Sequence, residues 1–204
     1  MKEENRQHSR PLLLSRKPLA EGKWIRLEQL HYRDSTGRER IWELATRQQA
    51  IQAVCMIASC VPTRQWVLIR QFRPPAGRKV LEFPAGLIHP TETVENAAVR
   101  EFLEETGFHL QIQTVHPPVF NSPGLTDEAA WIVTGQVDLQ TPENQHPRPR
   151  PDPGEEIEVI LVGQTELERQ IQIEFNQGHG VDAKVLLFAL GQGLCWAGET
   201  QSPK

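Results

Sequence analysis

The sequence lacks the features of several common protein classes. Its 204 residues carry 26 Asp and Glu against 22 Lys and Arg, which gives a formal net charge of −4. A general nucleic-acid binder needs a basic face to displace counterions, and this charge balance does not provide one. The longest candidate apolar run, at 185–190, has six residues, whereas a helix needs roughly 20 to span a bilayer. We therefore expect neither a nucleic acid nor a membrane as partner.

Cysteine is also scarce. Cys55, Cys60 and Cys195 are odd in number and lack the paired spacing of a metal site. The first residues are too polar for a signal peptide, and the leucines at 12–14 are too few for its apolar region. We therefore expect a reduced, cytoplasmic protein in which the three thiols serve only packing.

The length suits one domain with a small appended unit. Strands are predicted at 24–32 and 40–46, on either side of a turn signal at 34–37. Because an isolated hairpin is only marginally stable, this pair should pack on a partner. The expected divisions are a flexible tail at 1–20, an N-terminal β unit at 21–48, a main domain at 49–192 and a C-terminal tail at 193–204.

The main domain alternates between the two kinds of secondary structure. Its apolar patterns predict strands at 54–58, 66–72, 130–137 and 157–162, and helices at 94–106, 166–175 and 183–190. Interleaved strands and helices are typical of an α/β protein in which helices cover a sheet.

Residues 140–154 stand apart because they hold five prolines with charged residues between them. One interpretation is an extended surface linker. The other is a stiff loop that delivers the following Glu155 and Glu156 to a site. The sequence leaves both open.

The most informative stretch is an acidic helix. Thr93 is a plausible N-cap, and Gly107 can take the positive φ of a residue that ends a helix. Between them, Glu101 and Glu105 lie one turn apart on one face and Glu104 flanks them. Three unpaired acids near a helix C-terminus are disfavoured by the helix dipole.

Two interpretations of these acids remain. A solvated helix face is the usual explanation of a Glu-rich helix. A bound divalent cation is the alternative, and oxygen ligands would select Mg²⁺ or Mn²⁺. Residues 92–105 contain five acids and one base, Arg100, so the local charge of −4 equals that of the whole chain.

The loop before this helix supports a cation site. A Pro-Ala-Gly turn at 84–86 follows a strand-like stretch at 79–81. Such a turn lets a backbone carbonyl approach a metal, and Gly86 removes the obstruction of a Cβ atom. An ordinary turn glycine is the alternative explanation.

These residues resemble a known motif. Gly86, five residues, Glu92, seven residues and then REFLEETGF at 100–108 match the Nudix box at every defined position. The resemblance implies the Nudix fold, a mixed β-sheet in an α/β/α sandwich, here with a small N-terminal antiparallel β unit. It also implies metal-dependent hydrolysis of a nucleoside diphosphate linked to another group.

The same resemblance assigns roles within the box. Arg100 would orient the acidic cluster and pair with Glu92. The implied metal is Mg²⁺, with Mn²⁺ as a substitute. Its implied ligands are the Ala85 carbonyl and the carboxylates of Glu101, Glu104 and Glu105.

Stretches outside the box resemble the eukaryotic-type ADP-ribose and ADP-sugar pyrophosphatases, notably 21–24, 71–75, 82–87 and 122–128. This likeness implies that Trp24 and Trp42 sandwich the adenine, one from each subunit of a homodimer, although strand packing would also explain two tryptophans. Arg73 would contact the diphosphate. Arg47, Leu87 and Ser122 are the remaining implied substrate contacts, and Ser122 stands where some relatives carry Asp.

The implied reaction converts ADP-ribose to AMP and ribose 5-phosphate, with a loop carboxylate accepting the proton of the attacking water. Glu155 is the candidate base, and Glu156 and Glu158 compete with it. In a strand, Glu156 and Glu158 would share one face and Glu155 would lie on the other. The alternatives are a pyrophosphatase for another nucleoside diphosphate sugar or an oxidised nucleoside diphosphate, and a non-catalytic ADP-ribose sensor.

Overall fold

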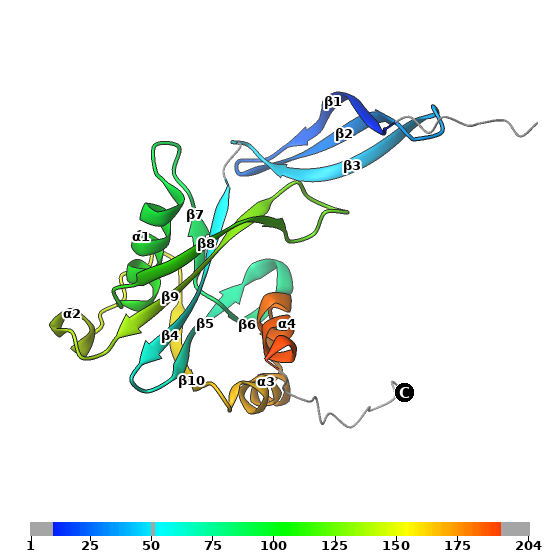
Figure 1. Ribbon diagram of the computed structural model, residues 1–204. Coiled ribbons are helices and arrows are strands. Elements are labelled where there is room, and N and C mark those ends of the chain that lie inside the picture. The colour runs from blue at the N-terminus through cyan, green and yellow to red at the C-terminus, as the bar shows by residue number, and fades with distance from the viewer. Residues whose placement is uncertain (1–9, 50–51, 193–204) are drawn as a thin grey trace, which may run out of the picture. The chain divides into compact units, whose positions relative to one another are not determined.

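The computed structural model describes residues 10–49 and 52–192. The chain divides into two compact units, each taken here by itself (Figure 1). Unit 1 comprises residues 1–52 and 118–130, and unit 2 comprises residues 53–117 and 131–204. The expected C-terminal tail at 193–204 lies outside the described residues.

Unit 1 contains a three-stranded antiparallel sheet of order β1-β2-β3, formed by Leu12–Glu21, Ile25–Arg33 and Glu39–Arg47. The predicted turn joins β2 to β3. In it the Asp34 carboxylate accepts the backbone N–H groups of Thr36 and Arg38 at 2.9 and 3.0 Å. Both predicted strands are therefore confirmed, as is the turn between them.

The prediction of a loose tail at 1–20 is wrong for β1, while residues 1–9 lie outside the described part. β1 pairs with β2 along its length, yet every side chain of β1 is exposed. Register shifts at 13–15 and 18–20 further interrupt its alternation. The backbone ladder holds this strand, so its side chains carry no periodic signal.

Unit 2 is built on a mixed sheet of order β11-β6-β5-β4-β9-β8, with β10 on β5 and β7 on β4. β11 pairs with β6 in parallel, whereas β10 and β6 pair antiparallel with β5, and β7 pairs antiparallel with β4. The ends of β8 and β9 at 118–120 and 129–130 belong to unit 1. The strands are Ala53–Val61 (β4), Gln65–Arg73 (β5), Arg78–Glu82 (β6), Ala85–Leu87 (β7), Gln111–Phe120 (β8), Ala129–Asp138 (β9), Ile157–Gly163 (β10) and Gly180–Val181 (β11).

Helices cover both faces of this sheet, which confirms the α/β/α sandwich (Figure 1). On one face Phe102 of α1 packs in a cluster with Val67 of β5. On the other, Ile171 of α3 and Val185 of α4 pack in a cluster with Leu68 of β5. Among the described residues no helix is long and apolar enough to cross a bilayer. The helices are Val94–Thr106 (α1), Pro142–Gln145 (α2), Leu167–Asn176 (α3) and Ala183–Gly191 (α4), with a 3-10 turn at Pro74–Ala76.

The two described cysteines lie in this core. Cys55 and Cys60 are free thiols on β4, and both are buried. Burial raises the pKa of Cys55 to about 12 and that of Cys60 to about 11. Thiols held in this neutral form are poor nucleophiles, so these two serve packing.

Candidate functional site

Helix α1 begins and ends at the predicted residues. The Thr93 side chain accepts the backbone N–H of Asn96 at 3.2 Å, and Gly107 adopts φ 74° while its N–H donates to Leu103 O. Both caps are local features, which is why the sequence indicates them. They place the three acids of the cluster in the last two turns of the helix.

Gly86 makes room for one of those acids. A Cβ atom at Gly86 would lie 2.0 Å from the carboxyl carbon of Glu101. The Glu101 carboxylate therefore occupies the space that a side chain at position 86 would fill. Gly86 lies in strand β7, paired with Val54, and not in the predicted turn at 84–86; its contact with Glu101 gives it a steric requirement of its own.

Glu105 is the most buried acid of the cluster, at 5 % exposed. Its carboxylate accepts the backbone N–H of Ala85 at 2.9 Å. Burial raises the pKa of Glu105 to about 8, although the bond from Ala85 acts in the opposite direction. A positive charge placed beside this group would favour its ionised form.

Arg100 binds several oxygens around it. Its Nε and Nη2 donate to the two carboxylate oxygens of Glu92 at 2.9 and 2.8 Å. Its Nη1 lies 2.9 Å from Glu101 and 3.0 Å from Glu104, and Nη2 also donates to the Leu87 carbonyl at 3.0 Å. Arg100 thus makes the expected pair with Glu92 and contacts two of the predicted metal ligands.

The acidic cluster suits a cation by the kind of donor atoms it offers, and not by a converging arrangement of its side chains. Among residues 10–49 and 52–192, no three His, Cys, Asp or Glu side chains converge as a metal-binding set. Arg100 engages Glu101 and Glu104, while Glu105 accepts from Ala85. The available donors are nevertheless all oxygens, which is the set that Mg²⁺ and Mn²⁺ prefer. The space at Gly86 holds one of these carboxylates directly against the backbone.

Arg73 has a partner that the sequence did not indicate. Its Nε and Nη2 donate to the Glu82 carboxylate at 2.9 and 2.6 Å, and this ion pair raises the pKa of the guanidinium. Glu82 lies on β6 between Leu81 and Phe83, both fully buried. An acid within a buried strand needs a partner, and that is the signal that could have identified it.

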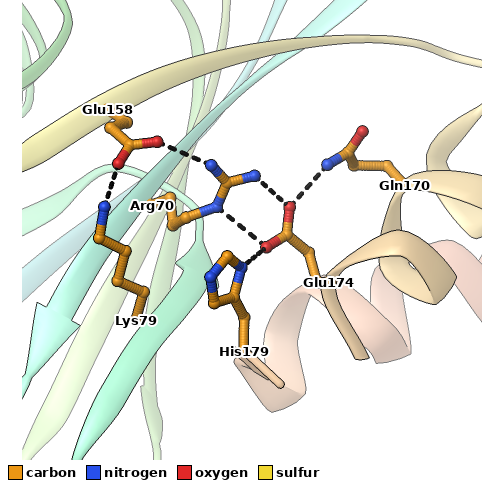
Figure 2. A network of polar contacts seen from close by, with 6 residues as sticks. All are labelled: Arg70, Lys79, Glu158, Gln170, Glu174 and His179. Atoms are coloured by element: carbon orange, nitrogen blue, oxygen red, sulfur yellow. Dashed lines mark hydrogen bonds and ion pairs between the residues drawn. The ribbon is translucent and has the colours of Figure 1, made fainter. Parts of the chain in front are cut away.

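Glu155 lies within electrostatic reach of this cluster. Burial is the main cause that raises the pKa of Glu101 and Glu105, and the negative charge of Glu155 adds to it in both. Gly154, at φ 96°, precedes Glu155, whose N–H donates to Asp152 O at 3.0 Å. The competitor Glu158 is instead paired with Arg70 and Lys79 (Figure 2).

The proline-rich segment at 140–154 contacts α1. This favours the interpretation as an ordered loop over that as an extended surface linker. The Arg150 N–H donates to Glu104 O at 2.7 Å. A Cβ atom at Gly107 would lie 2.3 Å from Arg148 N, so the segment passes closely over the helix end. Asn144, buried in α2, accepts the His109 N–H at 2.7 Å and is a further anchor that the sequence did not reveal.

The two tryptophans assigned to adenine lie in unit 1. Trp24 is 71 % exposed and Trp42 is 49 % exposed, so neither ring is buried in the packing of this chain. The Lys23 ammonium lies 4.5 Å from the Trp24 ring centroid, and Trp42 Nε1 donates to Gly124 O at 3.1 Å. Large exposed aromatic surfaces of this kind suit stacking on a planar ligand or a partner protein.

Arg47 borders a pocket of about 240 Å³ in unit 1. Its Nε donates to Glu128 at 2.6 Å, and Arg16, Arg26 and Asp127 also line the pocket. Of these residues, only Arg47 is predicted from the sequence to contact the substrate. The others come from β1, β2 and the 122–128 loop, and only the folded sheet brings them together.

The predicted site residues are thus divided between the two units. Ser122 begins a turn in unit 1, where its carbonyl accepts the N–H groups of Leu125 and Thr126 at 2.9 and 3.0 Å. Unit 1 carries Trp24, Trp42, Arg47 and Ser122. Unit 2 carries Arg73, Ala85, Leu87, Arg100, Glu101, Glu104, Glu105 and Glu155.

Comparisons with known proteins agree with this architecture. Residues 51–182 match the family model described as the NUDIX domain. The chain is 35 % identical over 187 residues to an ADP-sugar pyrophosphatase of Mus musculus, covering 88 % of this chain and 86 % of that protein. It is 35 % identical over 184 residues to an ADP-ribose pyrophosphatase of Saccharomyces cerevisiae, covering 86 % and 79 %. A crystal structure of an ADP compounds hydrolase has a similar fold, with a TM-score of 0.67 at 23 % identity over 91 % of this chain and 97 % of that one.

Proposed function

Because the chain belongs to the Nudix family of hydrolases, we propose that it hydrolyses the diphosphate of ADP-ribose to AMP and ribose 5-phosphate with Mg²⁺, for which Mn²⁺ can substitute. The acidic cluster that carries the proposal has Glu101 seated against Gly86 and Glu105 against Ala85. The two relatives named as ADP-sugar and ADP-ribose pyrophosphatases support the choice of substrate.

The residues of unit 2 have complementary tasks. Ala85, Glu101, Glu104 and Glu105 would hold the cation, which when bound supplies charge neutralisation at the diphosphate and a more acidic water. Arg100 contacts Glu101 and Glu104 through the same nitrogen, Nη1, and so orients both carboxylates. Arg73 has its Nε and Nη2 on Glu82, so its Nη1 is the nitrogen to meet a phosphate oxygen.

Purified protein incubated with Mg²⁺ and ADP-ribose should release AMP, detected by anion-exchange chromatography. Comparing kcat/KM for ADP-ribose, ADP-glucose, UDP-glucose and GDP-mannose gives the sugar and base preference. A higher value for a non-adenine substrate would move the assignment to another nucleoside diphosphate sugar. Binding of ADP-ribose without turnover of any of the four would indicate a sensor instead of an enzyme.

Glu155 is proposed as the base that accepts the proton of the attacking water. Its charge contributes to the raised pKa of Glu101 and of Glu105, and the loop before it is bonded to α1 through the Arg150 N–H and Glu104 O; both observations support its assignment to this site. Glu155→Gln should lower kcat by roughly 10²–10⁴-fold, the usual contribution of a general base, and should leave KM nearly unchanged.

Glu156→Gln is the matched control, because it removes the neighbouring carboxylate from the same loop. It should retain near-normal kcat in the same AMP-release assay. If Glu156→Gln carries the loss and Glu155→Gln does not, the base is Glu156.

Unit 1 is proposed to supply the adenine contacts and a homodimer interface. Trp24 and Trp42 would stack on the base, a contact worth about 1–3 kcal/mol per base. A dimer is supported by the exposed apolar side chains on the three strands, which are Leu12, Leu13, Leu14, Leu19, Ile25, Leu27 and Ile41. Light scattering at micromolar concentration should give twice the chain mass of 23.2 kDa, and a monomer would contradict the interface. We also propose a cytoplasmic location, on the free thiols of Cys55 and Cys60.

A further inference from the structure

A polar network lies on the face of the unit 2 sheet that α3 and α4 cover, opposite the face that carries α1. Arg70 belongs to this face because it alternates with Leu68, which packs in the cluster of α3 and α4. Figure 2 shows the six side chains of the network, which are Arg70, Lys79, Glu158, Gln170, Glu174 and His179.

Glu174 of α3 is the fixed point of this network. Its side chain is 0 % exposed. One carboxylate oxygen accepts from Arg70 Nη2 and Gln170 Nε2, both at 2.6 Å. The other accepts from Arg70 Nε at 2.9 Å and contacts His179 Nδ1 at 2.7 Å. A buried carboxylate held by four contacts from three residues has no freedom to turn, so it holds the Arg70 guanidinium in one orientation.

The third nitrogen of that guanidinium, Nη1, binds the Glu158 carboxylate. Arg70 Nη1 donates to one oxygen of Glu158 at 2.7 Å, and the Lys79 ammonium contacts the other (Figure 2). An exposed ion pair is usually weak, partly because two long side chains must be ordered to form it. Here Glu174 has already ordered Arg70, so less entropy is lost when Glu158 binds. We call Arg70, Lys79 and Glu158 the β10 clamp.

The β10 clamp acts close to the loop that carries Glu155. Glu158 is the second residue of β10 and lies opposite Arg70 in the strand register. Upstream, the Arg150 N–H is bonded to Glu104 O on α1 at 2.7 Å. The segment that contains Glu155 is therefore tied to the catalytic helix at one end and to the clamp at the other.

We propose that the β10 clamp positions Glu155, so that Lys79, Arg70 and Glu158 are positioning residues of the reaction. The inference rests on the proposed function, in which Glu155 is the base. The clamp contacts β10 on the face that α3 and α4 cover, whereas the loop just upstream of Glu155 lies against α1, where the Arg150 N–H donates to Glu104 O. The clamp therefore fixes the position at which the loop enters β10, and it does so from the face of the sheet opposite α1.

Lys79→Met tests this with little risk to folding, since Lys79 is partly exposed. We expect kcat for ADP-ribose to fall about tenfold, because small misplacements of a reacting group are costly, while KM stays within about twofold. Lys79→Arg should restore most of kcat. Lys184→Met is the control, because it removes a comparable ion pair with Asp182 outside the network, and it should leave kcat unchanged.

A double-mutant cycle separates positioning from general destabilisation. Once Glu155→Gln has removed the base, adding Lys79→Met or Glu158→Gln should change kcat by less than about twofold. A full tenfold loss in that background would overturn the proposal, as would equal kcat for Lys79→Met and the wild type. If the wild-type protein hydrolyses no diphosphate substrate, the proposed function is wrong, and so is the positioning role of the β10 clamp that rests on it.

Discussion

Replacing Glu101 by Gln is expected to lower kcat for Mg²⁺-dependent hydrolysis of ADP-ribose by about 10²–10³-fold, as the loss of one group that stabilises transition-state charge does elsewhere. The amide keeps the size of the carboxylate that occupies the space at Gly86. It removes the negative charge, which is the property a divalent cation needs. AMP release at saturating Mg²⁺ measures the effect. A lowered affinity should appear as a higher Mg²⁺ concentration at half-maximal rate.

Glu95→Gln is the matched control for this substitution. Glu95 lies in the first turn of the same helix, is exposed, and is not one of the predicted metal ligands. Its variant should keep kcat within about twofold of the wild type. If Glu101→Gln behaves like Glu95→Gln, the assignment of Glu101 to the cation is wrong.

Gly86→Ala should reproduce much of the Glu101 effect without changing any charge. The added methyl group would lie 2.0 Å from the carboxyl carbon of Glu101 and would displace it. The displaced atoms are the end of a flexible side chain, so the urea midpoint of unfolding should change little. A normal kcat in this variant would show that catalysis does not need the Glu101 carboxylate to lie against the backbone of Gly86.

Replacing Glu174 by Gln should cause the largest loss of stability. Removing one partner from a buried ion pair typically costs about 3–5 kcal/mol, and Glu174 is fully buried with Arg70 bound through two nitrogens. Urea unfolding should show this as a lower midpoint. Glu143→Gln, at an exposed position in the same unit, should stay within about 0.5 kcal/mol of the wild type.

The Glu174 effect should also depend on pH. Hydrogen bonds from Arg70, His179 and Gln170 outweigh burial and lower the pKa of Glu174 below its ordinary 4.5. A carboxyl group whose pKa is lower in the folded state stabilises the protein above the unfolded pKa, and this is lost as the pH falls through the folded pKa. The difference between wild type and Glu174→Gln should therefore shrink below pH 4.5. A difference that is constant with pH would show that packing, and not charge, causes the loss.

The sequence predicted the features that neighbouring residues determine. The bounds of α1 depend on Thr93 and Gly107, each of which bonds within four residues. The sandwich follows from the continuous apolar run in β5, because its neighbouring residues Val67 and Leu68 pack in clusters on opposite faces of the sheet. These patterns lie within short stretches, so they are visible without the structure.

The missed features depend on residues far apart in the chain. The spacing of Glu174 from Leu167 and Ile171 places it on the buried face of α3. Its partner Arg70 is 104 positions away, and no local pattern identifies it. Glu82 stands in the sequence only as part of the stretch 82–87 that resembles the ADP-sugar pyrophosphatases. Its ion pair with Arg73 depends on the pairing of β5 with β6. β1 was missed because its backbone, not its side chains, attaches it to the sheet.

The bond from Arg150 to Glu104 has a consequence for how this family member can vary in length. With Arg150 fixed on α1 and β10 beginning at Ile157, only residues 151–156 are free to span the gap. Each inserted residue adds up to about 3.3–3.6 Å of reach, so insertions or deletions there would move Glu155 away from the acidic cluster. An insertion in the exposed stretch just before Arg148 adds no slack to that span. Length variation among related chains should therefore accumulate before Arg148 and be rare between Arg150 and Glu155.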